Sequence, residues 1–266
     1  MKKSLVTIIL LLVTVPFIFA KDLSGELKIA GGTAHLKFMK TIAKNMMRKN
    51  PNLKISIEGG GSGVGIKKVG ENLVDIGNSG RDLKEDEIKK YGLIPYKIAI
   101  DGIAVIVNRN NTIKDLTFEQ MARIFSGEIS NWKQLGGEDA KINIYTRDAE
   151  SGTRKTFVKL GLKKGKIASD GIIVNSNGNM KTLVSGDKYG IGYISIGYLD
   201  DSVKGLSIEG INPNTDNVKN GSYEIRRFLY SVTKGEPKGL AKSFIDNLLN
   251  EDGQKIIKKY GFIPVK

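Results

Sequence analysis

Apolar and polar positions follow two periodicities that alternate along most of the chain. Residues 25–30 and 53–58 alternate apolar and polar side chains as strands do, and residues 36–49 between them repeat apolar side chains at helical spacing. The same rhythm predicts further strands at 74–77, 98–108, 142–146, 190–196 and 227–233. It predicts further helices at 65–72, 83–91, 117–126, 151–160, 180–185, 240–250 and 254–260. Such alternation is typical of α/β proteins, in which helices cover largely parallel sheets.

Two of these strands, 98–108 and 227–233, are long and apolar and flank a block of domain size. A chain that leaves one lobe, builds a second and returns needs two such crossover segments, which together form a hinge. We therefore predict two α/β lobes, each a mostly parallel sheet flanked by helices, joined by two hinge strands. The first lobe is expected to comprise residues 21–100 and 227–266, and the second lobe residues 101–226.

The first twenty residues have the pattern of a secretory signal peptide. Lys2 and Lys3 precede an apolar run at 5–19, and Ala20 is a small residue at a plausible cleavage point. The run is shorter than the roughly 20 residues that span a bilayer. Ile18 is less suited than alanine to its place before the cut, so an uncleaved anchor is the alternative. We expect an exported, soluble protein in the periplasm or another extracytoplasmic space.

The amino-acid composition excludes several kinds of site and partner. The chain has 266 residues, no cysteine and one histidine, His35. Lipid attachment at an N-terminal cysteine and zinc on thiolates are therefore excluded, and we expect no metal and no cofactor. The formal net charge of +14 favours anionic partners. Lysine is spread along the chain without a dense basic run, and Trp132 is the only tryptophan, so we do not expect nucleic acid as the partner.

Three segments share one design, in which a predicted strand is followed by a turn rich in Gly, Ser and Thr and then by a helix start. They are residues 31–34, 59–63 and 147–153. The start of a helix offers unpaired N–H groups and a positive dipole end, and glycine lets an anion approach the backbone. Arg147 adds a fork of donors suited to an oxyanion. Taken singly, each segment is more often a helix cap or a plain turn than an anion site.

Motifs typical of enzymes fail on inspection. A phosphate-binding loop would need Lys and then Ser or Thr after Gly65, where Ile66 and Lys67 stand, and a dinucleotide fingerprint would need glycine in place of Ile66. A nucleophile elbow would need glycine in place of Val64. His35 is the one histidine that could act as a general base, and no serine pairs with it in the sequence. We therefore predict a binding protein rather than an enzyme.

Several ordered motifs resemble the periplasmic phosphate-binding proteins that serve phosphate ABC transporters, in their shorter form. The resemblance covers nearly all of the chain after the leader, and its most specific marker is Arg147 followed by Ser151-Gly152-Thr153-Arg154. The other markers are residues 31–33, 60–65, 75–81, 101–108, 124–132, 190–193, 253–254 and 261–264.

This resemblance implies a type II periplasmic-binding-protein fold with a dehydrated anion buried between the lobes. It also implies that the protein delivers inorganic phosphate, as a monomer, to membrane permease subunits. The alternatives are another oxyanion, such as sulfate, molybdate or a small phosphate ester, or a sensor that does not transport. The positions that match the family's ligand-binding residues are Gly32, Thr33, Ala34, Ser62, Gly63, Gly80, Arg147, Ser151, Gly152 and Thr153.

Three positions depart from the family pattern. Gly32 stands where serine is common, Gly80 where serine or aspartate is found, and Glu150 where glycine is usual. In members with aspartate at the position of Gly80, the carboxylate accepts the proton of hydrogen phosphate and excludes fully ionised sulfate, which glycine cannot do. We hypothesise that another carboxylate supplies the acceptor, since a negative group beside a bound dianion is costly unless they share a proton. The candidates are Asp75, Asp148 and Glu150.

Overall fold

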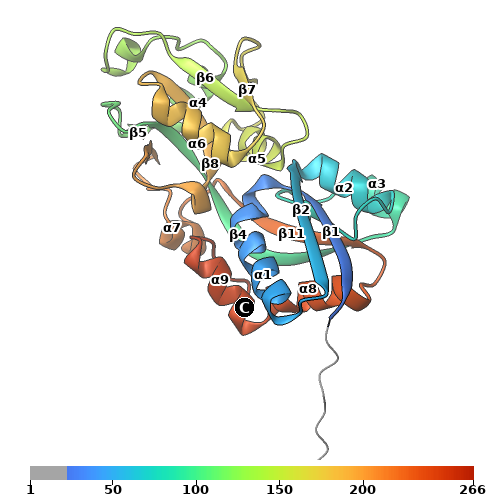
Figure 1. Cartoon of the computed structure of the whole chain (residues 1–266). Coiled ribbons are helices and arrows are strands. Elements are labelled where there is room, and N and C mark those ends of the chain that lie inside the picture. Colours follow the sequence, from blue (N-terminus) through green and yellow to red (C-terminus); the bar gives the residue numbers. More distant parts are fainter. Residues whose placement is uncertain (1–22) are drawn as a thin grey trace, which may run out of the picture.

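The computed structural model describes residues 23–266, and the predicted leader at 1–20 lies outside the described residues. Two α/β lobes lie side by side, and the long strand β4 (Leu93–Asn108) runs from one into the other (Figure 1). The first part of β4 pairs with β11 (Arg226–Lys234), and its second part pairs with β8 (Gly190–Ser195). The chain thus crosses to the second lobe along β4 and returns along β11. The predicted fold class, two α/β lobes joined by two hinge strands, is confirmed.

The sheet of the first lobe has the strand order β2-β1-β3-β11-β4. In it, β1 (Gly25–Gly31) is parallel to β2 (Leu53–Gly60) and β3 (Ile76–Ser79), whereas β11 is antiparallel to both of its neighbours. One hydrophobic core lies where α1, α8 and α9 pack on this sheet, around Phe38, Phe244 and Phe262. The helices of this lobe are η1 (Thr33–His35), α1 (Leu36–Lys49), α2 (Ser62–Gly70), α3 (Glu85–Tyr91), α8 (Gly239–Leu249) and α9 (Glu251–Lys259).

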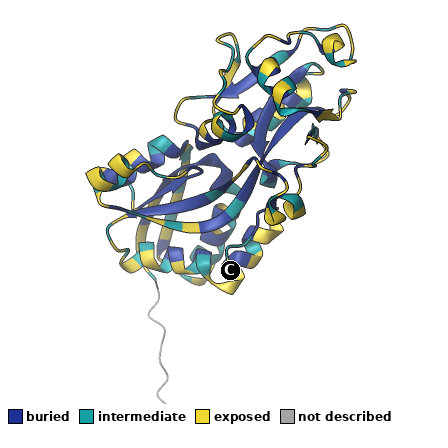
Figure 2. Ribbon diagram, turned by 180° about the vertical axis from the view of Figure 1, so that it is seen from behind, coloured by how far each residue is buried: buried dark blue, intermediate teal, exposed yellow. Residues whose placement is uncertain are grey.

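The sheet of the second lobe continues from β4 through β8 and β6 (Asn143–Arg147) to β7 (Ile172–Val174), and β9 (Val203–Gly205) pairs with the end of β4. Its core includes Phe157 stacked on Tyr193, with ring centroids 4.1 Å apart. Figure 2 shows the strands of both lobes buried between helices whose outer faces are exposed. The remaining elements are β5 (Asp115–Leu116), α4 (Phe118–Phe125), η2 (Trp132–Leu135), α5 (Gly152–Thr156), the π-helix η3 (Phe157–Gly161), α6 (Asn177–Gly186), η4 (Ile196–Tyr198), β10 (Ser207–Ile208) and α7 (Thr215–Asn220).

Some boundaries differ from the sequence-based expectation. The helix expected at 65–72 begins three residues earlier, at Ser62, because Gly61 takes a φ of 91° and turns the chain directly from strand to helix. The strand expected at 98–108 begins at Leu93, because residues 93–97 pair with residues 230–234 of β11. Strands β5, β7, β9 and β10 were missed because two or three residues carry too little pattern.

Core membership changes along β4. Ala99 belongs to the core of the first lobe, and Ile103 belongs to the core of the second. The expected lobe boundary between residues 100 and 101 falls between these two positions, and the exact division of the chain stays a prediction. Within residues 23–266, no helix combines the length and apolar character needed to cross a membrane.

Candidate functional site

A small cavity lies where the chain leaves β1, β2 and β6 and enters the helices that follow. We call it the interlobe cavity, and its volume is only about 10 Å³. Every ligand-binding residue expected from the sequence lines it except Gly63. The lining residues are Gly32, Thr33, Ala34, Gly61, Ser62, Gly80, Arg147, Ser151, Gly152, Thr153 and Arg227.

Arg147 is the last residue of β6, and its side chain is 1% exposed. Nε donates to the carbonyl of Val174 at 2.8 Å and Nη2 to that of Asn175 at 2.9 Å, which fixes the guanidinium plane. Nη1 is buried and finds no hydrogen-bond partner among residues 23–266. Burial lowers the pKa of Arg147 and the nearby Asp148 carboxylate partly offsets this. A buried donor on a cationic group without a partner is costly, so Nη1 is suited to an anionic ligand.

Three hydroxyl groups on the cavity wall are oriented as donors. Ser62 Oγ accepts from the N–H of Gly80 at 2.9 Å, and Ser151 Oγ accepts from the N–H of Arg154 at 3.2 Å. Thr33 Oγ1 accepts twice from Asn177, from the backbone N–H and from Nδ2. None of the three hydroxyl groups donates a hydrogen bond to another of the described residues, so each O–H is available to a ligand.

Backbone donors complete the wall. Ser62 begins α2, and Gly152 begins α5, which continues as the π-helix. The first N–H groups of a helix have no partner within the helix and carry the positive end of its dipole. The cavity therefore presents hydroxyls, N–H groups and one free guanidinium nitrogen, which suits an ion that only accepts.

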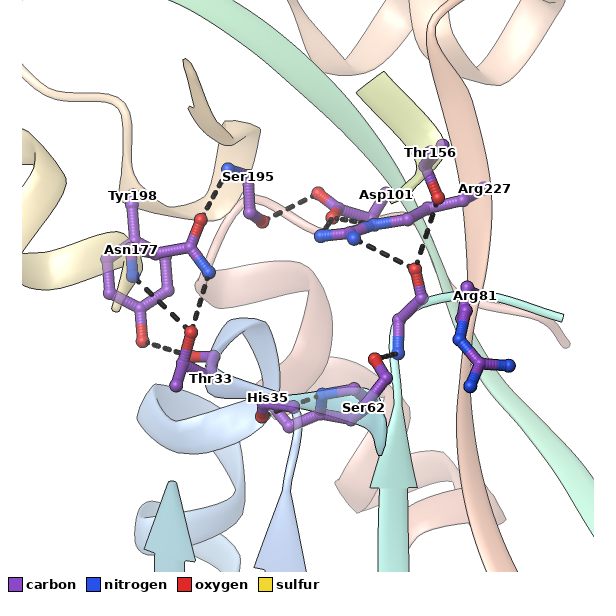
Figure 3. A network of polar contacts seen from close by, with 12 residues as sticks. Thr33, His35, Ser62, Arg81, Asp101, Thr156, Asn177, Ser195, Tyr198 and Arg227 are labelled. Carbon is purple, nitrogen blue, oxygen red and sulfur yellow. Dashed lines mark hydrogen bonds and ion pairs between the residues drawn. The ribbon is translucent and has the colours of Figure 1, made fainter. Parts of the chain in front are cut away.

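A network of hydrogen bonds surrounds the cavity and joins the two lobes (Figure 3). Asn177 Nδ2 donates to Thr33 Oγ1 at 3.0 Å, and the hydroxyl of Tyr198 donates to the Thr33 carbonyl at 2.8 Å. A third contact between the lobes joins the N–H of Gly63 to the Glu150 carbonyl, which accepts at 3.1 Å. The lobes are thus in contact around the cavity, and Gly63 takes part in that contact instead of lining it.

Gly61 and Arg227 line the cavity but are not among the predicted ligand-binding residues. Gly61 belongs to the predicted turn at 59–63, but no motif in the sequence indicated Arg227. Its Nη2 and Nε lie 2.8 and 2.9 Å from Asp101 Oδ2, and its Nη1 donates to the Gly80 carbonyl at 2.8 Å. Ser195 Oγ donates to the other carboxylate oxygen of Asp101 at 2.7 Å. An arginine at the head of an apolar strand is the one signal in the sequence that could have indicated this buried ion pair.

Side chains lie close to two of the positions that depart from the family pattern. A Cβ atom on Gly80 would lie 2.8 Å from Arg227 Nη1, and one on Gly32 would lie 2.8 Å from His35 Nδ1. Arg227 and His35 therefore occupy the space that larger residues would need at positions 80 and 32.

His35 packs behind Gly32, where burial and then the charge of Arg227 lower its pKa to about 3. In the unfolded chain the group takes up a proton as the pH falls through about 6.5, whereas in the folded chain it does not. Stability is therefore lost as the pH falls from about 6.5 towards 3.

We expect the free energy of unfolding to fall by about 2 kcal/mol through this group between pH 7 and pH 5. In His35→Gln the free energy of unfolding should fall by about 2 kcal/mol less between these pH values, as measured by urea titrations at pH 7 and pH 5. His35 is the only histidine in the chain, so no other imidazole contributes. The same pH dependence in both proteins would contradict the expectation.

The three carboxylates considered as acceptors do not line the interlobe cavity. Asp75 is exposed at the far end of β3 and accepts from the N–H of Lys28 at 2.7 Å. Asp148 accepts from the N–H of Glu150 at 2.9 Å, and the Glu150 side chain lies against Gly63. Among residues 23–266 the cavity lining contains no carboxylate, so the expected acceptor is not brought to the site.

Comparison with known proteins adds independent information. Residues 21–252 match the PBP superfamily domain. The phosphate-binding protein PstS of Bacillus subtilis is 41% identical over 91% of this chain and 81% of its own length. PstS of Borreliella burgdorferi is 33% identical over 99% of both chains.

Solved structures agree with this similarity. A phosphate ABC transporter substrate-binding protein from Clostridium perfringens with bound phosphate has a TM-score of 0.86 and 40% identity, over 91% of this chain and all of that one. A phosphate transport receptor from Vibrio cholerae has a TM-score of 0.73 and 35% identity, over 89% of this chain and 99% of that one.

Proposed function

Since the chain belongs to the PstS family of phosphate-binding proteins within the PBP superfamily, we propose that it captures inorganic phosphate in the interlobe cavity and delivers it to an ABC transporter. The residues proposed to hold the ion are the cavity residues predicted from the sequence, together with Gly61 and Arg227. Gly63 is proposed to contribute through the contact between the lobes.

The observation that carries this proposal is the free Nη1 of Arg147 among hydroxyls that are set to donate. Phosphate offers four oxygen atoms around one centre, which is the kind of ligand that such a shell of donors can dehydrate and hold. Hydrogen bonds to a charged group contribute about 1.5–3 kcal/mol each, so a few of them support tight binding.

Transport follows from the two-lobed fold under this proposal. The lobes, 21–100 with 227–266 and 101–226, close on the ion along the hinge strands, and membrane permease subunits recognise the closed form. We propose that the protein is exported by its leader, works as a monomer and has no catalytic role. Binding of substrate without chemistry is the activity of the family to which the chain belongs.

Sulfate is the second candidate ligand, because no carboxylate among the described residues lines the cavity. Sulfate has no proton to donate, and a site rejects it strongly only if it presents an acceptor that sulfate would leave unpaired. We expect sulfate to bind within about tenfold of phosphate.

Titration calorimetry with phosphate and with sulfate tests both statements. Binding of one phosphate per chain supports the proposed function, and its absence would overturn it. A preference for phosphate far above tenfold would show that an acceptor operates in the cavity.

A further inference from the structure

A second cavity lies on the other side of Arg227 from the interlobe cavity, and Arg227 lines both. We call it the rear cavity. Its volume of about 360 Å³ falls within the range of small-molecule sites, about 300–1,000 Å³. It is lined by Arg81, Asp82, Ile100, Lys155, Thr156, Lys159, Leu160, Arg226, Arg227 and Phe228.

Both lobes build the rear cavity. Arg81 and Asp82 come from the loop after β3, while Lys155 and Thr156 come from α5 in the second lobe. Figure 3 shows Arg81, Thr156 and Arg227 together on one side of the polar network. Thr156 Oγ1 donates across the lobes to the Gly80 carbonyl at 3.4 Å. The cavity is therefore complete only while the lobes are in contact.

The rear cavity is strongly cationic. Five of its lining side chains carry a positive charge, and Asp82 is the one carboxylate among them. Glu87 forms an ion pair with Arg81, and Asp101 forms one with Arg227. Lys155, Lys159 and Arg226 have no carboxylate within 4.0 Å in the part of the chain that the structure describes. An anion in the cavity would balance this charge.

Arg81 places a largely buried cation in the wall of the rear cavity. Its side chain is 9% exposed, and its Nε is buried without a hydrogen-bond partner among residues 23–266. Both of its terminal nitrogens are used by Glu87, at 2.8 and 2.6 Å. Burial and the charge of Arg81 also lower the pKa of Lys155, as expected where like charges lie close together.

Apolar side chains form the rest of the wall, namely Ile100, Leu160 and Phe228. We propose that the rear cavity is a second anion-binding site, which takes a small organic phosphate whose apolar part packs on these three side chains. The phosphate group faces Arg81, Lys155 and Lys159. The ligand differs from that of the interlobe cavity, whose volume of about 10 Å³ is far too small for an aromatic or other organic group.

Phenyl phosphate is a suitable probe, because it joins a phosphate dianion to one aromatic ring. It is titrated calorimetrically into the protein in the absence of inorganic phosphate and at saturating phosphate, with phenol as the uncharged comparison. We expect one phenyl phosphate to bind per chain while phosphate occupies the interlobe cavity, and phenol not to bind.

Lys155 and Lys159 are exposed, so Lys155→Gln/Lys159→Gln is expected to fold. In this variant the affinity for phenyl phosphate should fall by roughly tenfold, as for the loss of two partly exposed ion pairs. Its affinity for inorganic phosphate should stay the same, which also shows that it is folded. The matched control is Lys40→Gln/Lys44→Gln, which removes two exposed lysines at the same spacing on α1 and should bind phenyl phosphate as the unmodified protein does.

Two results would overturn the second site. One is that phosphate displaces phenyl phosphate, which would place both in the interlobe cavity. The other is that the two double variants bind phenyl phosphate equally well. Weaker binding in the first double variant alone, at saturating phosphate, supports the proposal.

Discussion

Replacement of Arg147 by methionine is expected to weaken phosphate binding by a factor of about 100 or more, the largest effect of any single substitution in the chain. The substitution removes the free Nη1 donor and the positive charge of a buried guanidinium that lines the cavity. Losing one partner of a buried, hydrogen-bonded charge pair costs about 2–5 kcal/mol, and each 1.4 kcal/mol is a factor of ten. Titration calorimetry with phosphate measures the loss.

Arg147→Lys tests whether charge alone suffices. Lysine keeps the charge but cannot donate to the Val174 and Asn175 carbonyls as the guanidinium does. The affinity of the Arg147→Lys protein for phosphate should therefore also be low. Arg48→Met, at an exposed arginine on α1, is the control and should bind phosphate normally. Phosphate affinity within threefold of normal in a folded Arg147→Met protein would rule out this site as the ligand cavity.

Gly152→Ala is expected to weaken phosphate binding by roughly 30- to 150-fold. A Cβ atom at this position would overlap Ser62 Oγ and lie 3.0–3.1 Å from the backbone of Gly80, both on the opposite wall of the cavity. Overpacking of this kind costs about 2–3 kcal/mol. The clash destabilises only the state in which the two lobes are in contact, because the atoms involved belong to different lobes. Calorimetry gives the affinity, and a thermal unfolding scan without phosphate shows whether the lobes stay intact.

Gly178→Ala is the matched control for this substitution. Gly178 stands near the start of α6, as Gly152 does at the start of α5, and its added Cβ would meet no atom nearer than 3.9 Å among the described residues. Its phosphate affinity should be unchanged. Normal affinity in Gly152→Ala would mean that the lobes do not approach as closely as they do in this structure when the ion is bound.

The three anion-binding segments of the site were predictable from the sequence because each is formed by consecutive residues. A strand end, a turn of small residues and a helix start are consecutive in the chain, so the segments at 31–34, 59–63 and 147–153 carry their own signal. The structure brings nearly all of their predicted residues to one cavity. The partners that orient these residues, such as Asn177 and Tyr198 beside Thr33, are far away in the chain and had no such signal.

Position 80 shows where sequence reasoning stops. Glycine at this position indicated a missing acceptor, and Asp75, Asp148 and Glu150 were proposed as substitutes. In the structure the space beside Gly80 is taken by Arg227, which lies 147 residues away in the chain and is held by Asp101. A contact of this separation is set by how β4 and β11 pair across the hinge, and no short motif encodes it.

The sequence alone therefore determined the α/β class, the two crossover strands, the three helix starts and Arg147 as the charged donor, because periodicity and short motifs record local structure. The tertiary structure alone decided which donors stay free, where Arg227 lies, that the candidate carboxylates stay outside the interlobe cavity and that a second cationic cavity lies behind it. Those features depend on hydrogen bonds and packing between residues brought together by the meeting of two lobes, and a linear pattern does not specify such distances.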